Sequence, residues 1–117
     1  MILGSHVSVA GGLDKGVQRA VDVGCDCIQI FTKNNNQWAA KPLSEDAVSA
    51  WNAAISDSGL THPIAHTSYL INMATPDDAL FRKSVDALVV EMERANLLGL
   101  EGLVVHPGAF TKSSEEE

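Results

Sequence analysis

The stretch GLVVHPG, residues 102–108, decides the fold class. Leu103, Val104 and Val105 form an apolar, mostly β-branched run that is typical of a buried strand. Pro107 and Gly108 then turn the chain. Between the strand and the turn lies an imidazole, that of His106. The segment therefore predicts a strand over residues 102–105 that ends in a polar side chain.

Earlier segments repeat this pattern of a strand, a loop and a helix. Strands are expected at residues 2–7, 27–31 and 63–66. A first helix is expected at residues 13–23, and a second between its N-cap Ser44 and Gly59. A third is expected to begin at the N-cap Thr75, with Pro76 in its first turn, and to run to Leu98. Strands alternating with helices predict a parallel sheet of right-handed crossover units. No G-x-G-x-x-G follows the first strand, which disfavours a dinucleotide-binding sheet and favours a (β/α) barrel.

Composition and charge limit the class of protein without fixing its partner. The chain has 117 residues and no long apolar tract, so it predicts a single globular unit with no membrane span and no secretory signal. Cys25 and Cys27 are too close for an ordinary disulfide, and we expect small reduced side chains in the cytoplasm. The net charge of −7 argues against phosphate binding, but bound divalent cations would reverse the local potential.

Three of the four histidines fall at the same end of the predicted sheet. His6, His66 and His106 each close a strand, and barrel enzymes keep their chemistry at that end. Neighbouring strands lie about 4.8 Å apart, so His66 and His106 are candidate ligands of a shared metal ion. Hydrogen-bonded loop histidines are the alternative for both. The role of His6 stays open, and His62 is expected to face solvent at the opposite end.

Two polar loops at this end are candidate binding elements. Tyr69 and Asn72 follow the third strand, where they either contact a ligand or anchor the loop. The segment TKNNNQW, residues 32–38, is expected either to contact phosphates and a groove or to form an Asx-turn loop held in place by Trp38. The core is expected to contain the side chains of Trp51, Met73 and Met92. Glu91 and Glu93 are expected on the solvated surface.

Four motifs occur in an order and spacing that resemble one known family. GSHVSVAGGL, IQIFTKNNNQW, HTSYLINMATP and LVVHPGA are together similar to the N-terminal part of the endonuclease IV family of apurinic/apyrimidinic endonucleases. The resemblance covers essentially the whole chain. It implies a TIM barrel with a trinuclear zinc site that hydrolyses the phosphodiester 5′ to an abasic site in double-stranded DNA during base excision repair.

The resemblance also implies roles for individual residues. It places zinc ligands at His66 and His106, and DNA contacts at Tyr69 and Asn72. The loop with Lys33, Asn35 and Asn36 would enter the minor groove. Some relatives carry an arginine in this loop that fills the gap in the base stack; here Asn35 and Asn36 stand at the tip, which argues against insertion of a strong wedge.

Chain length adds a further expectation. A (β/α)8 barrel needs about 250 residues, so we expect residues 1–117 to be the N-terminal portion of one such domain, with four strands and three helices. The missing C-terminal half would bring the other ligands; the chain alone is then inactive, and the full-length protein is expected to be a monomer. Ser113 or Ser114 is expected to cap a further helix. Two alternatives remain, a metal-dependent sugar isomerase on a related barrel and a non-catalytic half barrel that self-associates.

Overall fold

A computed structural model describes residues 1–111 of the chain. Its elements run in the order β1 (Gly4–His6), α1 (Leu13–Asp22), β2 (Cys27–Phe31), α2 (Glu45–Ser58), β3 (Thr61–His66), α3 (Asp78–Leu97) and β4 (Gly102–Val104). The helix expected after Ser113 or Ser114 lies outside the described residues. The alternation of strand and helix predicted from the sequence is confirmed.

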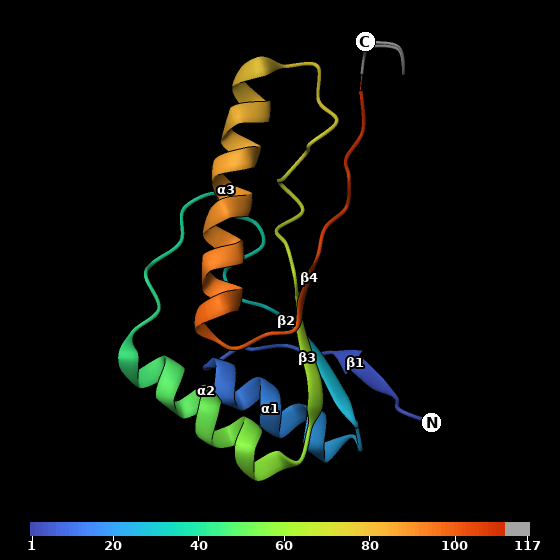
Figure 1. The fold of residues 1–117 in the computed structure, drawn as a ribbon, viewed down its shortest axis with the longest axis vertical. Coiled ribbons are helices and arrows are strands. Elements are labelled where there is room, and N and C mark those ends of the chain that lie inside the picture. Colours follow the sequence, from blue (N-terminus) through green and yellow to red (C-terminus); the bar gives the residue numbers. More distant parts are fainter. Residues whose placement is uncertain (112–117) are drawn as a thin grey trace.

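The four strands form one parallel sheet in the order β1-β2-β3-β4. Consecutive strands are therefore neighbours, as in a barrel wall, and the helices lie on one side of the sheet (Figure 1). Helices α1 and α2 lie side by side near the amino-terminal part of the sheet, whereas α3 stands beside β4. The predicted partial (β/α) barrel is correct.

The core lies between the sheet and α1 and α2. Side chains alternate along β2, so Ile28 and Ile30 point into the core while the flanking residues Cys27, Gln29 and Phe31 are partly buried on the other face. The buried side chains of the cluster are Val17, Ala20, Ile28, Ile30, Trp51, Leu60 and Leu98. Trp51 donates its indole N–H to the carbonyl of Leu98 at 2.9 Å, so the predicted core position of this tryptophan is confirmed.

The helix ends follow local chemistry, with one correction. Ser44 caps α2 by accepting the N–H of Ala47 at 3.1 Å, and Gly59 ends the helix in the left-handed region, both as predicted. The predicted cap Thr75 is wrong for α3. Asp77 is the N-cap and accepts the N–H of Leu80 at 2.8 Å, while Thr75 accepts the N–H of Asp77 in the preceding turn.

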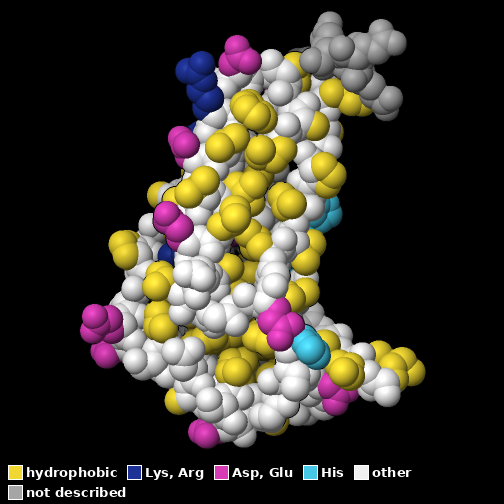
Figure 2. Space-filling view, viewed as in Figure 1, with side chains coloured by type: hydrophobic (Ala, Val, Ile, Leu, Met, Phe, Trp, Pro, Cys, Tyr) yellow, Lys and Arg dark blue, Asp and Glu magenta, His cyan; other side chains and the backbone are white. Residues whose placement is uncertain are grey.

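Hydrophobic side chains remain exposed on α3, at the end of β4 and on the segment that follows it. They include Phe81, Val89, Val90, Met92, Leu97, Val104, Val105 and Phe110. Figure 2 shows such side chains gathered over the part of the molecule formed by α3 and the neighbouring segments. The predicted core position of Met92 is wrong, since its side chain is 57% exposed, and Met73 is only partly buried.

In the described part of the chain, none of the helices combines the length and apolar character that crossing a bilayer requires.

Candidate metal and nucleic-acid site

Aromatic rings gather at the carboxyl ends of the strands. His6 ends β1, Phe31 ends β2, His66 ends β3, and His106 follows β4. The ring centroids of His66 and His106 lie 4.8 Å apart, and those of His6 and His66 lie 6.1 Å apart. The strand register places these rings at one edge of the sheet, because His6 pairs with Gln29, Phe31 pairs with His66, and His66 pairs with Val104, two residues before His106.

The ring of His66 is oriented by the backbone. Its Nδ1 lies 2.7 Å from the carbonyl oxygen of Thr67, which can only accept, so Nδ1 carries the proton and donates it. The other nitrogen, Nε2, then holds a lone pair and has no hydrogen-bond partner within residues 1–111. This is the arrangement found for metal-binding histidines, in which the second ring nitrogen donates to a carbonyl or carboxylate.

His6 has the opposite tautomer. The side-chain amide nitrogen of Gln29 donates to Nδ1 of His6 at 2.9 Å, so the proton of the neutral ring is on Nε2. Burial, with a smaller effect from neighbouring His66, lowers the pKa of His6 and favours this neutral form. In this state His6 offers a hydrogen-bond donor rather than a free lone pair.

Two imidazoles fit part of a metal site. A closed zinc site takes four ligands and a catalytic one takes three from the protein. Within residues 1–111, no three His, Cys, Asp or Glu side chains come together in a way that could hold a metal ion. The free Nε2 of His66 beside the ring of His106 would suit two ligands of such a site, so the donor set is incomplete in the part of the chain that the structure describes.

Tyr69 extends this ring cluster towards solvent. Its ring meets His66 edge-on at 5.3 Å between centroids and His106 at 5.9 Å, and also contacts Phe31. The side chain is nevertheless 61% exposed. An exposed aromatic ring next to the histidine pair is suited to contact a bound ligand.

Asn72 is engaged within the protein. Its Oδ1 accepts the N–H groups of Ala74 and Ala109, and its Nδ2 donates to the carbonyl of Ala109 at 2.9 Å. The amide thus ties the loop after β3 to the segment that follows His106. The geometry matches the anchoring alternative for Asn72, and a contact with DNA stays a prediction.

The loop after β2 is closed by its own side chains. Asn34 accepts the N–H of Asn36 at 2.9 Å, which is an Asx turn, and Lys33 donates to the carbonyls of Asn34 and Gln37. Burial is the largest effect on Lys33 and lowers its pKa. Trp38 is partly buried beneath the ammonium of Lys83. The Asx-turn loop pinned by Trp38 is therefore present.

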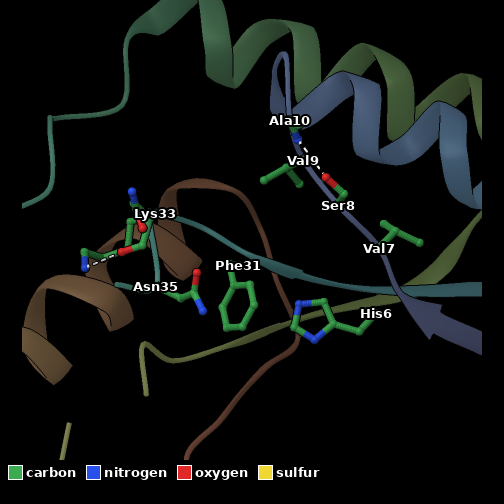
Figure 3. A pocket seen from close by; sticks show the side chains of 9 residues that line it. His6, Val7, Ser8, Val9, Ala10, Phe31, Lys33 and Asn35 are labelled. Carbon is green, nitrogen blue, oxygen red and sulfur yellow. Dashed lines mark hydrogen bonds between the residues drawn. The ribbon is translucent and has the colours of Figure 1, made fainter. Parts of the chain in front are cut away.

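This loop forms one wall of an open groove of about 680 Å³. The opposite wall is the segment after β1, and the rings of His6 and Phe31 lie side by side at the base (Figure 3). Asn35 lies next to Phe31, and its carbonyl accepts the hydroxyl of Ser68 at 2.7 Å. The groove therefore leads from the asparagine loop to His6.

The sequence interpretation missed Glu91. This side chain of α3 was expected on the surface but is 1% exposed; the predicted exposure of Glu93 is correct. Glu91 turns inward because its Oε2 accepts the N–H of Ser68 at 2.8 Å, in the loop after β3. Burial is the largest effect on this carboxyl and raises its pKa.

Arg94, one turn further along α3, is also buried. It donates to the carbonyls of Thr32 and Lys41 and so holds both ends of the loop after β2. In the sequence, Glu91 and Arg94 stand out only as an acidic and a basic residue three positions apart on one helix face. That spacing does not distinguish a buried face from a solvated one.

At the opposite end of the sheet, His62 contacts the carboxylate of Glu101 at 2.8 Å, with both side chains exposed. The prediction that His62 lies at the end opposite the strand-end histidines and faces solvent is confirmed. Cys25 and Cys27 are free and partly buried.

Comparison with known proteins gives a consistent family. The chain is 43% identical to a protein named probable endonuclease 4 from Citrifermentans bemidjiense, over 98% of this chain and 41% of the relative. The structure resembles that of endonuclease IV from Thermus thermophilus with a TM-score of 0.87 at 38% identity, covering 94% of this chain and 41% of that one. A 3-keto-D-glucoside 4-epimerase from E. coli shares the fold alone, with a TM-score of 0.66 at 16% identity, over 92% of this chain and 38% of the epimerase.

The chain thus spans about 41% of the length of the curated relatives that it matches. A family model described as a xylose isomerase-like TIM barrel matches residues 17–117. The resemblance to the N-terminal part of endonuclease IV proteins is confirmed, and the chain belongs to the xylose isomerase-like TIM barrel family.

Proposed function

We propose that this chain forms the N-terminal portion of a cytoplasmic, zinc-dependent apurinic/apyrimidinic endonuclease. In this proposal the enzyme hydrolyses the phosphodiester 5′ to an abasic site in double-stranded DNA, as part of base excision repair. The remaining strands of a single (β/α)8 domain supply the rest of the site. The full-length enzyme is a monomer, and residues 1–117 alone do not cleave DNA.

One observation carries the proposal: the rings of His66 and His106 lie 4.8 Å apart at the carboxyl edge of the sheet, with Nε2 of His66 unprotonated. The 43% identity to a probable endonuclease 4 supports a nuclease. The epimerase likeness at 16% identity concerns the fold alone and does not favour the sugar isomerase alternative.

The chemistry follows from the residues present. His66 and His106 would hold zinc through ring nitrogens, and zinc, when bound, stabilises charge on phosphate oxygens and lowers the pKa of a bound water. His6 presents an Nε2–H donor beside this pair, suited to a phosphate oxygen.

The loops position the DNA. Tyr69, exposed beside both histidines, offers an apolar ring that can pack against the abasic sugar or a neighbouring base. The loop with Asn35 and Asn36 contacts the minor groove through amide and backbone groups. Lys33 supports that loop from within, since its ammonium is bonded to the loop's own carbonyls.

The test is cleavage of a duplex with one abasic site by the full-length protein. We expect wild-type protein to nick the strand 5′ to the lesion, and His66→Ala and His106→Ala to reduce the rate at least a hundredfold. His62→Ala, which changes an exposed histidine at the other end of β3, is the matched control and should cleave normally. Normal cleavage by both site variants would reject the proposal. Turnover of a ketose without nicking would favour the isomerase.

A further inference from the structure

The peptide unit between Thr67 and Ser68 connects His66 to Glu91. Its carbonyl oxygen accepts the Nδ1 proton of His66 at 2.7 Å, and its N–H donates to Oε2 of Glu91 at 2.8 Å. The carbonyl and the N–H of one peptide unit are conjugated. A hydrogen bond to an acceptor on the N–H side therefore polarises the carbonyl and strengthens the bond from the imidazole.

The acceptor at the far end of this relay is fixed in place. Glu91 is 1% exposed, and its other oxygen, Oε1, has no hydrogen-bond partner within residues 1–111. Within the described residues, the N–H of Ser68 is thus the one hydrogen bond that this carboxylate accepts. The hydroxyl of Ser68 in turn donates to the carbonyl of Asn35 at 2.7 Å, so the loop after β2 also restrains the peptide.

We propose that Glu91 is a positioning residue, which acts through the Thr67–Ser68 peptide to hold His66 in the Nδ1–H tautomer with Nε2 directed to a divalent metal ion. A neutral imidazole in water favours the other tautomer, so this state of His66 requires a strong acceptor. The relay is a carboxylate–histidine pair with a peptide unit inserted between the two groups. The assignment of a metal to Nε2 rests on the proposed function; the tautomer does not.

The first test measures the tautomer without metal. Imidazole ¹⁵N shifts of the full-length, metal-free protein are recorded at about pH 9, above the ordinary imidazole pKa of about 6.5. We expect the Nδ1–H form for His66 in wild type and in Glu93→Gln, which alters an exposed glutamate of the same helix. In Glu91→Gln, which keeps the shape but removes the charge, the Nε2–H form should become measurably populated.

The second test measures affinity for Zn²⁺ alone by competition with a chelating dye. Loss of an outer partner of a metal-binding histidine weakens binding about 10-fold or more. We expect this loss for Glu91→Gln and none for Glu93→Gln. Equal tautomer populations and equal affinities in wild type and Glu91→Gln would overturn the inference.

A measurement on wild-type protein covers the case in which Glu91→Gln does not fold. A coupling across the hydrogen bond between the Ser68 nitrogen and the Glu91 carboxyl carbon, together with the Nδ1–H form of His66, would support the relay. A missing coupling, or His66 in the Nε2–H form, would refute it. The outcome is separable from that of the proposed function, because a protein that shows the relay but never nicks abasic DNA would reject only the nuclease.

Discussion

Gly108→Ala should detach the segment after His106 from the loop after β3. Gly108 has a φ of 106°, a region that an alanine adopts at a cost of about 1–3 kcal/mol. The added Cβ would overlap Oδ1 of Asn72 and lie 2.9 Å from its Cγ, so the amide has to leave. Asn72 then loses its bonds to Ala74 and to the N–H and carbonyl of Ala109, each with a net contribution of about 1 kcal/mol.

The summed local cost is roughly 4–6 kcal/mol. Because Gly108 and its neighbours are exposed and lie beyond the last strand, the least costly response is local opening rather than unfolding of the sheet. We therefore expect the midpoint of thermal unfolding to change little. The amide of Ala109 should lose most of its protection from hydrogen exchange, and the affinity for Zn²⁺ should fall as His106 becomes mobile.

The matched control is Gly102→Ala at the start of β4. There a Cβ meets only Cγ2 of Ile64 at 3.7 Å, an ordinary contact, and no unusual φ is required. This variant should keep the protection of Ala109 and the affinity for zinc. Equal protection of Ala109 in Gly108→Ala and wild type would refute the reasoning.

Three other changes test the packing that supports the site. Trp51→Phe should lower the free energy of unfolding by about 1–3 kcal/mol, because the buried carbonyl of Leu98 loses its hydrogen-bond donor. Trp38→Phe should lower it less, as measured by urea titration, and the reverse order would contradict the assigned core. Arg94→Met leaves the carbonyls of Thr32 and Lys41 without their donor and should lower the free energy of unfolding by about 3 kcal/mol. Hydrogen exchange in residues 32–41 should become faster, and unchanged exchange would show that Arg94 does not hold this loop. Burial raises the pKa of Glu91, so its carboxylate forms at a higher pH in the fold than in the unfolded chain. Relative to Glu91→Gln, wild type should therefore be most stable below the ordinary glutamate pKa and lose stability as pH rises through the raised value, and a parallel pH dependence of the two proteins would disprove this.

The sequence predicted the fold and the common edge of the strand-end histidines because both follow from local patterns. Apolar runs ending in His6, His66 and His106 place the rings at one edge wherever the strands are parallel and adjacent. The cap of α2 follows equally from Ser44 and Gly59, whose chemistry acts within a single turn.

The interior of the site could not be predicted in the same way. Glu91 and Met92 are adjacent on α3, and exchanging their predicted environments requires only a rotation of the helix by about one residue. What fixes the rotation is the N–H of Ser68, a donor from a distant loop, and no periodicity within the helix contains that information. Likewise, the tautomers of His6 and His66 depend on Gln29 and on Thr67, which act through tertiary and backbone geometry.

The central claim is that His66 and His106 bind one metal centre together. Titration of the full-length protein with Zn²⁺, followed through the ¹⁵N resonances of the four imidazoles of residues 1–117, tests it most directly. The account predicts that ring resonances of His66 and His106 shift together and saturate at the same zinc concentration, while those of His62, paired with Glu101 at the opposite end, stay in place. Zinc-induced shifts at only one of the two rings, or at neither, would contradict it.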